Sequence, residues 1–380
     1  MRTLFLCSMA AALKDILARL DGAYPFAWAV PEDRVGLQVG HPDQTVEVIL
    51  AALEASEPVV AEAQAQGAQL LLTHHPLIYH PLGEVREDGG AGRLLAAVLR
   101  AGLAVVACHT NLDVAPGGLN DYLARLLKLQ EVELLSPAGG DPFYKLTVFV
   151  PVGYEDRVRE ALFDDRAGVI GRYSHCSFAA RGQGTYLPLP GARPFRGEVA
   201  SLSRAEESRL EVLVPESRLE AALSRLKAAH PYEEVAYDLY PLKTSGTALG
   251  FGRLGRFSRA LDFSRLISRI KKIFGVRRVR VWGQAPARVE RVAVLGGSGG
   301  EFIGTAQKKG AQLYITGEVR HHQVDSGDLK DFAVLEVGHF HSEVVFIPEW
   351  VQQLNLLFQE AGLKVQVKCA QAEAPPFAYF

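Results

Sequence analysis

The sequence predicts an α/β protein whose main domain is interrupted by a smaller α+β domain. Apolar runs alternate with amphipathic helical patterns over the first and last parts of the chain. This rhythm is typical of a mainly parallel sheet covered by helices on both faces. The middle part instead has the order strand, helix, strand, strand, helix, strand, which is the ferredoxin-like order. The length of 380 residues is comfortable for two domains.

The outer parts of the chain carry the alternating pattern. Their strands are short runs rich in valine and leucine, as in strands that are buried on both faces. Before the middle part we expect helices at 13–20, 57–66, 93–100 and 119–129 and strands at 46–50, 68–72 and 103–108. After it we expect helices at 263–274, 301–309 and 342–361 and strands at 277–282, 291–295, 311–316, 332–337 and 363–368.

Two runs rich in structure-breaking residues, at 136–142 and 243–255, mark the ends of the middle part. Between them we expect strands at 145–151, 173–179, 210–215 and 234–242 and helices at 155–163 and 217–230. The sequence therefore predicts a discontinuous α/β domain formed by residues 1–135 and 246–380. It also predicts an inserted ferredoxin-like α+β domain at 141–243.

The charge of the chain argues against a nucleic-acid or membrane partner. The formal net charge is −2, so the chain as a whole does not attract polyanions or anionic membrane surfaces. Arginines alternate with valines between Arg277 and Arg291, which favours the solvated face of a half-buried strand. Nucleic-acid binding through these arginines is the least favoured functional hypothesis.

The cysteines and the N-terminus bear on the compartment. The four cysteines show no close spacing, which predicts neither a disulfide framework nor a cysteine-ligated zinc site and fits a reducing environment. Residues 1–13 resemble a signal peptide only faintly, because the apolar run is short and continues directly into a helical pattern. We interpret them as an extended N-terminus, with Met9 as an alternative start to Met1. No apolar run is long enough to span a bilayer, and we expect a cytoplasmic protein.

Histidines and carboxylates gather just after three of the expected strands. These residues are His74 and His75, His109 and Asp113, and His339 and Glu343. In α/β proteins, sites form at the carboxyl ends of strands. The last two, four residues apart, share one face if a helix begins there. Each histidine taken alone is more readily an ordinary packed or capping residue, but the three clusters together predict one shared metal site.

The ligand chemistry favours two transition-metal ions. Imidazole and carboxylate ligands suit Zn, Fe, Mn, Co or Ni better than Ca, and five of them suit two divalent ions about 3.5 Å apart. Asp113 can bridge the ions, and His109 can be a direct ligand or an outer-shell donor. His74 and His75 would point to opposite faces of an ideal strand, so both reach one site only if the chain bends, which Pro76 favours.

Further motifs accompany the three clusters, in order, along nearly the whole chain. In the outer parts these motifs are DRVGLQVG at 33–40, THHPLI at 73–78, HTNLD at 109–113, GGSGG at 296–300, TGE at 316–318 and GHFHSE at 338–343. In the insert they are GVIG at 168–171, YSHC at 173–176 and HPYEE at 230–234. Together they resemble the motifs of the Nif-three-like dinuclear metal-centre family, whose members are often named GTP cyclohydrolase I type 2 homologues.

The resemblance implies a metal site, a fold and an assembly. It implies a three-layer α/β/α arrangement for the discontinuous domain. It also implies a homo-oligomer, a hexameric toroid with the metal sites facing inside. His109 would line the site. The ligands of the two ions would be His74, His75, Asp113, His339 and Glu343.

Other motifs admit two interpretations each. The run 320–323 departs from the family, because His321 replaces an aromatic residue and Gln323 an acid, whereas the family's histidine is kept at His322. His322 is either a proton donor or part of a polar helix start. The glycines at 296–300 form either a phosphate cradle or a plain tight turn. His230 is expected to cap the helix before it.

Two functions follow from the predicted site. The favoured one is a metal-dependent hydrolase of a nucleotide-like or phosphorylated small molecule, with His109 or His322 as general acid/base. By resemblance this is GTP cyclohydrolase chemistry, in which the imidazole ring of guanine is opened, although no base-binding residues stand out. The alternative is a non-enzymatic metal-binding or regulatory protein, metallochaperone-like, in which the insert senses a ligand.

Overall fold

The computed structural model describes residues 10–164, 166–244, 246–324 and 329–377, so Met1, Cys7 and Met9 lie outside the described residues. The chain divides into two compact units. The outer unit consists of Met1–Ala138 with Leu249–Phe380, and the insert unit is Gly139–Ala248. Among the described helices, none is long and apolar enough to cross a bilayer.

The outer unit contains a five-stranded sheet built from the first part of the chain and its last strand. The strand order is β17-β4-β5-β6-β2, parallel except for β2, which is antiparallel to β6. The strands are β2 Gly36–Val39, β4 Val48–Ala52, β5 Leu70–Thr73, β6 Ala104–Ala107 and β17 Gln366–Cys369. Two short strands, β1 Ala11–Ala12 and β3 Thr45–Val46, form a separate antiparallel pair.

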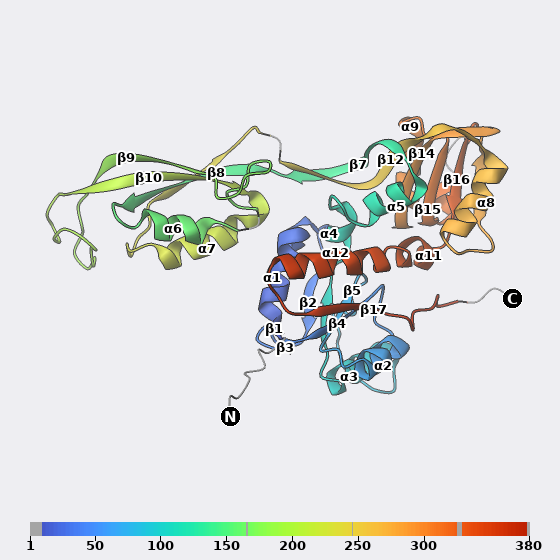
Figure 1. Ribbon diagram of the computed structural model, residues 1–380, viewed down its shortest axis with the longest axis horizontal. Coiled ribbons are helices and arrows are strands. Elements are labelled where there is room, and N and C mark those ends of the chain that lie inside the picture. The colour runs from blue at the N-terminus through green and yellow to red at the C-terminus, as the bar shows by residue number, and fades with distance from the viewer. Residues whose placement is uncertain (1–9, 165, 245, 325–328, 378–380) are drawn as a thin grey trace, which may run out of the picture. The chain divides into compact units, whose positions relative to one another are not determined.

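Alternate residues of these strands face two different apolar clusters. Leu71 of β5 packs with α2 Glu57–Ala65 and α3 Gly90–Arg100 on one face. Leu70 and Leu72 pack on the other face with α1 Leu13–Ala23 and α12 Ile347–Glu360. Figure 1 shows α2 and α3 on one side of this sheet and α12 on the other. Helices thus cover both faces, as the apolar, non-alternating strands predict.

A second, six-stranded sheet completes the outer unit, where the sequence pattern suggests a single sheet. Its order is β13-β16-β15-β14-β12-β7, with the three central strands β14, β15 and β16 parallel. The strands are β7 Gln130–Asp141, β12 Thr247–Asp262, β13 Arg280–Gln284, β14 Arg288–Ser298, β15 Leu313–Glu318 and β16 Phe332–Glu336. One face packs against α9 Ile303–Lys308, and the other shares the apolar cluster of the first sheet with α5 Leu119–Leu127 and α8 Phe263–Ile273. The α/β class is confirmed.

The insert unit has the ferredoxin-like topology that its element order predicts. Its antiparallel sheet has the order β11-β8-β10-β9. The elements are β8 Phe143–Pro151, α6 Glu155–Leu162, β9 Ser177–Tyr186, β10 Ser203–Pro215, α7 Leu219–Ala229 and β11 Tyr237–Pro241. Both helices pack on one face of the sheet, where Val148 and Leu210 meet Val158 and Leu226.

The two breaker runs are strands, which the sequence did not predict. β7 covers 136–141, and β12 includes most of 243–255. The two strands are neighbours at one edge of the six-stranded sheet. A Cβ on Gly250 would lie 2.6 Å from the Ser136 carbonyl oxygen, so the glycine permits close approach of the two backbones. Pro137 is tolerated because β7 is the edge strand.

Helix 342–361 is two helices rather than one. α11 His339–Val344 ends before α12 begins at Ile347, with Pro348 in the first turn of α12. Proline lacks the N–H that a continuing helix would need, so the break falls there. The break leaves α11 as a separate short helix that holds two of the predicted ligands.

Candidate metal centre

His74 and His75 leave β5 at its carboxyl end. Their backbone N–H groups still bond to the neighbouring chain segment, to Ala52 O at 3.1 Å and Leu53 O at 2.7 Å. The Thr73 hydroxyl donates to the His75 carbonyl at 2.7 Å and tightens the bend. As a result both rings reach the same cluster, with centroids 5.2 Å apart. The bend expected from Pro76 is present.

His109 and Asp113 follow β6 on a short helix, α4 Thr110–Val114. The Asp113 N–H bonds to the His109 carbonyl at 3.1 Å, which stacks the two residues one turn apart. The His109 ring lies 5.3 Å from that of His74 and 5.7 Å from that of His75. This helical turn brings Asp113 back towards the histidines.

His339 and Glu343 lie one turn apart on α11, so their side chains share a face, as their spacing predicts. The helix begins after Gly338, whose φ of 96° is a left-handed conformation that favours glycine. His339 Nε2 is 3.2 Å from Glu343 Oε2. The His339 ring lies 5.3 Å from the His75 ring, which joins α11 to the cluster from the first sheet.

The Glu343 carboxylate lies at the centre of the cluster. Its Oε2 is 3.0 Å from His75 Nε2, close to His339 Nε2 as well. Its Oε1 is 3.8 Å from His74 Nε2, and that nitrogen is 3.6 Å from Asp113 Oδ1. Each oxygen of one carboxylate therefore faces a different set of side chains.

Every histidine of the cluster uses its other nitrogen, Nδ1, on an outer partner. The pairs are His74 with the Cys108 carbonyl (2.9 Å), His75 with Glu54 (3.6 Å), His109 with Asp33 (2.8 Å) and His339 with Glu318 (3.3 Å). Such partners fix the orientation of the ring and direct Nε2 to the opposite side. The sequence motifs assign no role to these three carboxylates. A signal exists for Glu54, because it follows β4 at the same sheet edge as His75.

Three polar atoms of the cluster are buried without a hydrogen bond: His74 Nε2, Asp113 Oδ1 and Glu343 Oε2. The imidazole nitrogens near Glu343 Oε2 are close enough to it but do not point along hydrogen-bond directions. Leaving such atoms unsatisfied costs about 1–3 kcal/mol each. Nitrogens and oxygens that face a common space rather than one another fit a cation between them.

The electrostatics of the cluster also fit a cation. Burial would raise the pKa of Glu343, but the facing imidazoles of His339, His74 and His75 hold that pKa well below its usual range. Burial lowers the pKa of His75 and His339, but Glu343 outweighs burial and raises them to about 10 and about 9. Protons on these histidines balance the buried carboxylate, and a metal ion can replace those protons.

Asp113 shows the opposite behaviour. Burial raises the pKa of this carboxyl group, and the neighbouring His74 and His109 offset only part of the effect. A carboxylate that is costly to ionise without a partner is a good ligand once a cation lies beside it. Two groups of described residues, His74 with His75 and His109, and His75 with His339 and Glu343, have ligand atoms within 4.8 Å of one another.

Comparison with known proteins agrees with the sequence motifs. Residues 11–376 match the Duf34/NIF3 (NGG1p interacting factor 3) family. The chain belongs to this family. It is 38% identical over 366 residues to the "GTP cyclohydrolase 1 type 2 homolog" of Bacillus subtilis, covering 96% of this chain and 98% of the relative. A relative of the same name from Mycobacterium tuberculosis is 34% identical over 94% and 95% of the two chains.

A solved structure of a NIF3-related protein from Bacillus cereus has the same fold over nearly the whole chain. The TM-score is 0.79, with 36% sequence identity over 97% of this chain and 99% of the other. The names of the curated relatives refer to a GTP cyclohydrolase by homology. Family membership thus places the cluster in a fold shared with these relatives without fixing a reaction.

In this NIF3-family chain the glycine-rich run at 296–300 lies at the end of β14, and two of its glycines support the cluster. The Gly296 and Gly297 N–H groups already bond to Asn120 Oδ1 (3.1 Å) and Ser342 Oγ (2.9 Å). A Cβ on Gly297 would overlap Glu343 Oε1. Of the two interpretations of 296–300, a phosphate cradle would lack these two N–H groups. The missing side chain of Gly297 makes room for the central carboxylate.

His322 is not brought into the cluster. It lies exposed on the short helix α10 His321–Val324. Among the described residues it has no hydrogen bond or ion pair with a cluster member. Its neighbour Gln323 turns inward, and a Cβ on Gly300 would overlap its amide. The structure therefore brings together His109 and the five predicted ligands but leaves His322 apart.

Proposed function

We propose that the cluster holds two divalent transition-metal ions and that the protein is a metal-dependent hydrolase. The observation that carries this proposal is the position of Glu343, whose two carboxylate oxygens face two different sets of nitrogen and oxygen atoms. A carboxylate with separate ligands on each side is an arrangement that suits a two-ion site.

Each ion has its own candidate ligands. His74 and Asp113 lie towards Glu343 Oε1, and His75 and His339 lie towards Oε2. The sequence suggested Asp113 as the bridge, but these distances favour Glu343 in that role. The mixture of imidazole and carboxylate favours Zn, Fe, Mn, Co or Ni.

The chemistry would be hydrolysis with a positioned proton carrier. Two bound ions would lower the pKa of a water molecule and make it a nucleophile near neutral pH. His109 is the candidate general acid/base, because Asp33 holds its Nδ1 at 2.8 Å and leaves Nε2 facing the cluster. Burial lowers the pKa of His109, but the bond to Asp33 outweighs burial, so the net shift is upward. The raised pKa favours a ring that carries a proton to donate.

The substrate class rests on the relatives. Their shared name points to a nucleotide, so we propose a nucleotide-like or phosphorylated small molecule. The side chains of His75, His109 and His339 are 22–34% exposed, whereas His74 and Glu343 are buried. Partial exposure of one side of the cluster supports access for such a substrate.

Metal content is the direct test. Inductively coupled plasma mass spectrometry of the purified full-length protein should find about two transition-metal ions per chain. His75→Ala and Glu343→Gln should each lose metal, whereas His41→Ala, a change at an exposed histidine, should keep it. Wild-type protein without metal after supplementation would refute the proposal.

Turnover separates the two functional hypotheses. The metal-loaded protein should hydrolyse at least one member of a panel of nucleotides and sugar phosphates, and Asp33→Asn should slow that reaction while metal content stays near two. Two bound ions with no turnover across the panel would instead favour the metal-binding or regulatory alternative. We also propose a homo-hexamer, which sedimentation equilibrium would test.

A further inference from the structure

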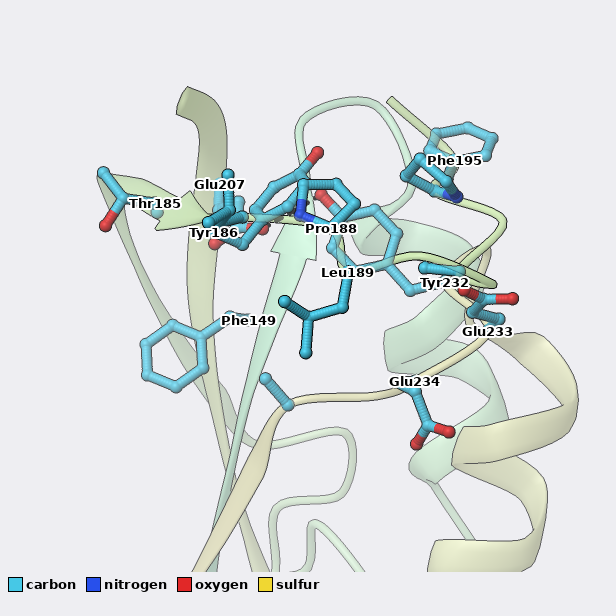
Figure 2. Close-up of a pocket in the computed structure, with 15 residues that line it drawn as sticks. Phe149, Thr185, Tyr186, Pro188, Leu189, Phe195, Glu207, Tyr232, Glu233 and Glu234 are labelled. Atoms are coloured by element: carbon cyan, nitrogen blue, oxygen red, sulfur yellow. Dashed lines mark hydrogen bonds between the residues drawn. The ribbon is translucent and has the colours of Figure 1, made fainter. Parts of the chain in front are cut away.

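The insert unit contains a pocket of about 610 Å³ that is distinct from the residues of the metal centre. This volume lies within the range of small-molecule sites, roughly 300–1,000 Å³. Its walls come from β8, β9, β10, the segment 187–195 and the segment 232–236. Figure 2 shows the lining side chains, among them Phe149, Tyr186, Phe195, Glu207 and Tyr232.

A buried carboxylate lies in the wall of the pocket. Glu207 on β10 is only 8% exposed, and its Oε1 accepts a hydrogen bond from the Tyr232 hydroxyl at 2.9 Å. Among the described residues, Glu207 Oε2 has no hydrogen-bond partner. Removing a carboxylate from water is costly unless a partner compensates it. One phenol offsets that cost only in part, which leaves one oxygen available to a ligand.

The sheet directs this carboxylate to the pocket side. Glu207 pairs with Gly182, so Gly184 and Tyr186, two and four residues on, face the same side of β9. A Cβ on Gly184 would overlap Glu207 Oε2. The glycine therefore leaves the space into which the carboxylate extends.

The phenol that holds Glu207 is itself fixed by the motif HPYEE. His230 receives the Tyr232 N–H on Nδ1 and bonds to the Phe149 carbonyl through Nε2, both at 3.1 Å. His230 is the C-cap residue of α7, as the sequence predicts, and its backbone N–H bonds to the Leu226 carbonyl at 2.9 Å. Its ring, however, holds the pocket wall rather than the last carbonyls of the helix. Burial lowers the pKa of His230 and raises that of Tyr232, which Glu207 raises further.

Aromatic rings form much of the remaining wall. The Tyr232 ring centroid is 5.9 Å from that of Phe195 and 6.4 Å from that of Tyr186. The faces of such rings attract cations. The guanidinium of Arg196 already lies 5.7 Å from the Phe195 centroid, so one of these rings accepts a cation within the protein itself.

The charge of the lining has one sign. Three glutamates line the pocket, at 207, 233 and 234, and none of its fifteen described lining residues is a lysine or arginine. Glu233 accepts the Arg193 N–H at 2.7 Å, so part of its capacity is used. An anion would be repelled, and a neutral apolar ligand would leave Glu207 Oε2 without a partner. A hydrated metal ion gains little from rings and aliphatic side chains.

We propose that this pocket binds an organic cation with an apolar body, such as an aryl- or alkylammonium compound. The ammonium group would lie against Glu207 and the ring faces, and the apolar body would fill the space beside Leu189. The aromatic wall supplies the cation–π attraction and the carboxylate supplies the charge.

Calorimetric titration of the full-length protein with benzyltrimethylammonium tests this proposal. The uncharged N-benzylacetamide, of similar size, is the control ligand and should bind about tenfold or more weakly. Glu207→Gln keeps the size of the side chain and an acceptor for Tyr232 but removes the charge, and should weaken binding of the cation at least about tenfold. Phe195→Leu, at a partly exposed ring, should weaken it severalfold and provides a second test if Glu207→Gln does not fold.

Glu206→Gln is the matched control, because Glu206 is the adjacent residue of β10, is exposed and does not line the pocket. It should bind the cation as the wild type does. No binding by the wild type, equal binding of the uncharged ligand, or equal effects of Glu206→Gln and Glu207→Gln would overturn the proposal. Binding that strengthens on dilution of the protein would show that a second copy occupies the pocket, which also overturns it.

Discussion

The variant Gly297→Ala tests whether metal binding depends on the position of Glu343, apart from any effect of the variant on the stability of the fold. Gly297 has a φ of 66°, and a Cβ there would overlap Glu343 Oε1 and lie 3.4 Å from His339 Nε2. Glu343 is 4% exposed and is enclosed by three imidazoles, so it has little free space into which to move. The new methyl group must therefore displace the carboxylate that we propose as the bridge.

Two effects of different size are expected. The left-handed backbone costs a residue with a Cβ roughly 1–2 kcal/mol, which lowers the free energy of unfolding. Displacement of Glu343 should in addition lower metal affinity about 10–100-fold, the range seen when the supports of metal ligands are lost. Gly310→Ala is the control for the first effect, because Gly310 has a φ of 77° and a methyl group there would have nothing within 4 Å.

For the wild type and both variants, the assay measures the metal content per chain after dialysis against a weak chelator. It also measures the midpoint of thermal unfolding of each protein. Both variants should unfold at lower temperature, and only Gly297→Ala should lose metal. If Gly297→Ala kept the wild-type metal content, or if Gly310→Ala lost metal equally, the central position of Glu343 would not matter for binding and its proposed bridging role would be refuted.

Three further outcomes are expected. Asp33→Asn should reduce turnover about tenfold or more, measured as kcat with metal content unchanged, because His109 loses its orienting carboxylate. Burial raises the pKa of Glu373 to about 7, against about 4.3 in the unfolded chain. The stabilisation that the protonated Glu373 gives the folded state is therefore full below about pH 4.3 and is lost as the pH rises to about 7. Glu373→Gln should remove this part of the pH dependence of the free energy of unfolding, measured by urea titrations. Arg253→Met should lower the free energy of unfolding by about 3 kcal/mol in the same titrations, because Arg253 is 3% exposed and paired with Asp121; a loss below about 1 kcal/mol would contradict this.

The sequence was most informative where apolar runs are unambiguous. The buried strands β4, β5 and β6 and the parallel strands β14, β15 and β16 are apolar without alternation, and their helices follow at ordinary loop lengths. Strands of this kind end at one sheet edge, so the residues directly after them could be grouped before the fold was known. The histidines and Asp113 that follow β5 and β6 lie together for this reason, whereas His339 and Glu343 follow β16 of the other sheet.

The breaker runs were misleading because glycine and proline have more than one use. In β7 and β12 they allow an edge strand and close backbone approach, as at Gly250 and Pro137, rather than a turn. Local composition does not report which strand a segment will pair with. The number of sheets was likewise out of reach, because it depends on long-range pairing such as that of β17 with β4.

The outer partners of the histidines were hidden for a related reason. Asp33 reaches His109 across 76 positions of sequence, and Glu54 reaches His75 from a different strand. A carboxylate far away in the chain has no periodic signal that links it to its histidine. For Asp33 and Glu318, only the chemical need of each imidazole for a partner on Nδ1 would have prompted a search, whereas Glu54 follows β4 at the same sheet edge as His75.

The proposed ligands come from both chain segments of the discontinuous domain. His74, His75 and Asp113 come from the edge of the five-stranded sheet, whereas His339 and Glu343 come from α11, after the six-stranded sheet. The chain then returns through α12 to β17, which pairs with β4 in the first sheet. Neither segment of the outer unit completes the cluster alone.

Cations bound between ligands from both segments would therefore stabilise the association of the two segments. The free energy of unfolding should rise with metal concentration according to RT ln(1 + [L]/Kd), which is about 2.7 kcal/mol at a hundredfold excess over Kd. The midpoint of thermal unfolding should be measured for the wild type and for Glu343→Gln, each with and without a chelator. A chelator that lowers the midpoint of the wild type but not that of Glu343→Gln would show this coupling. Equal midpoints in all four samples would exclude it.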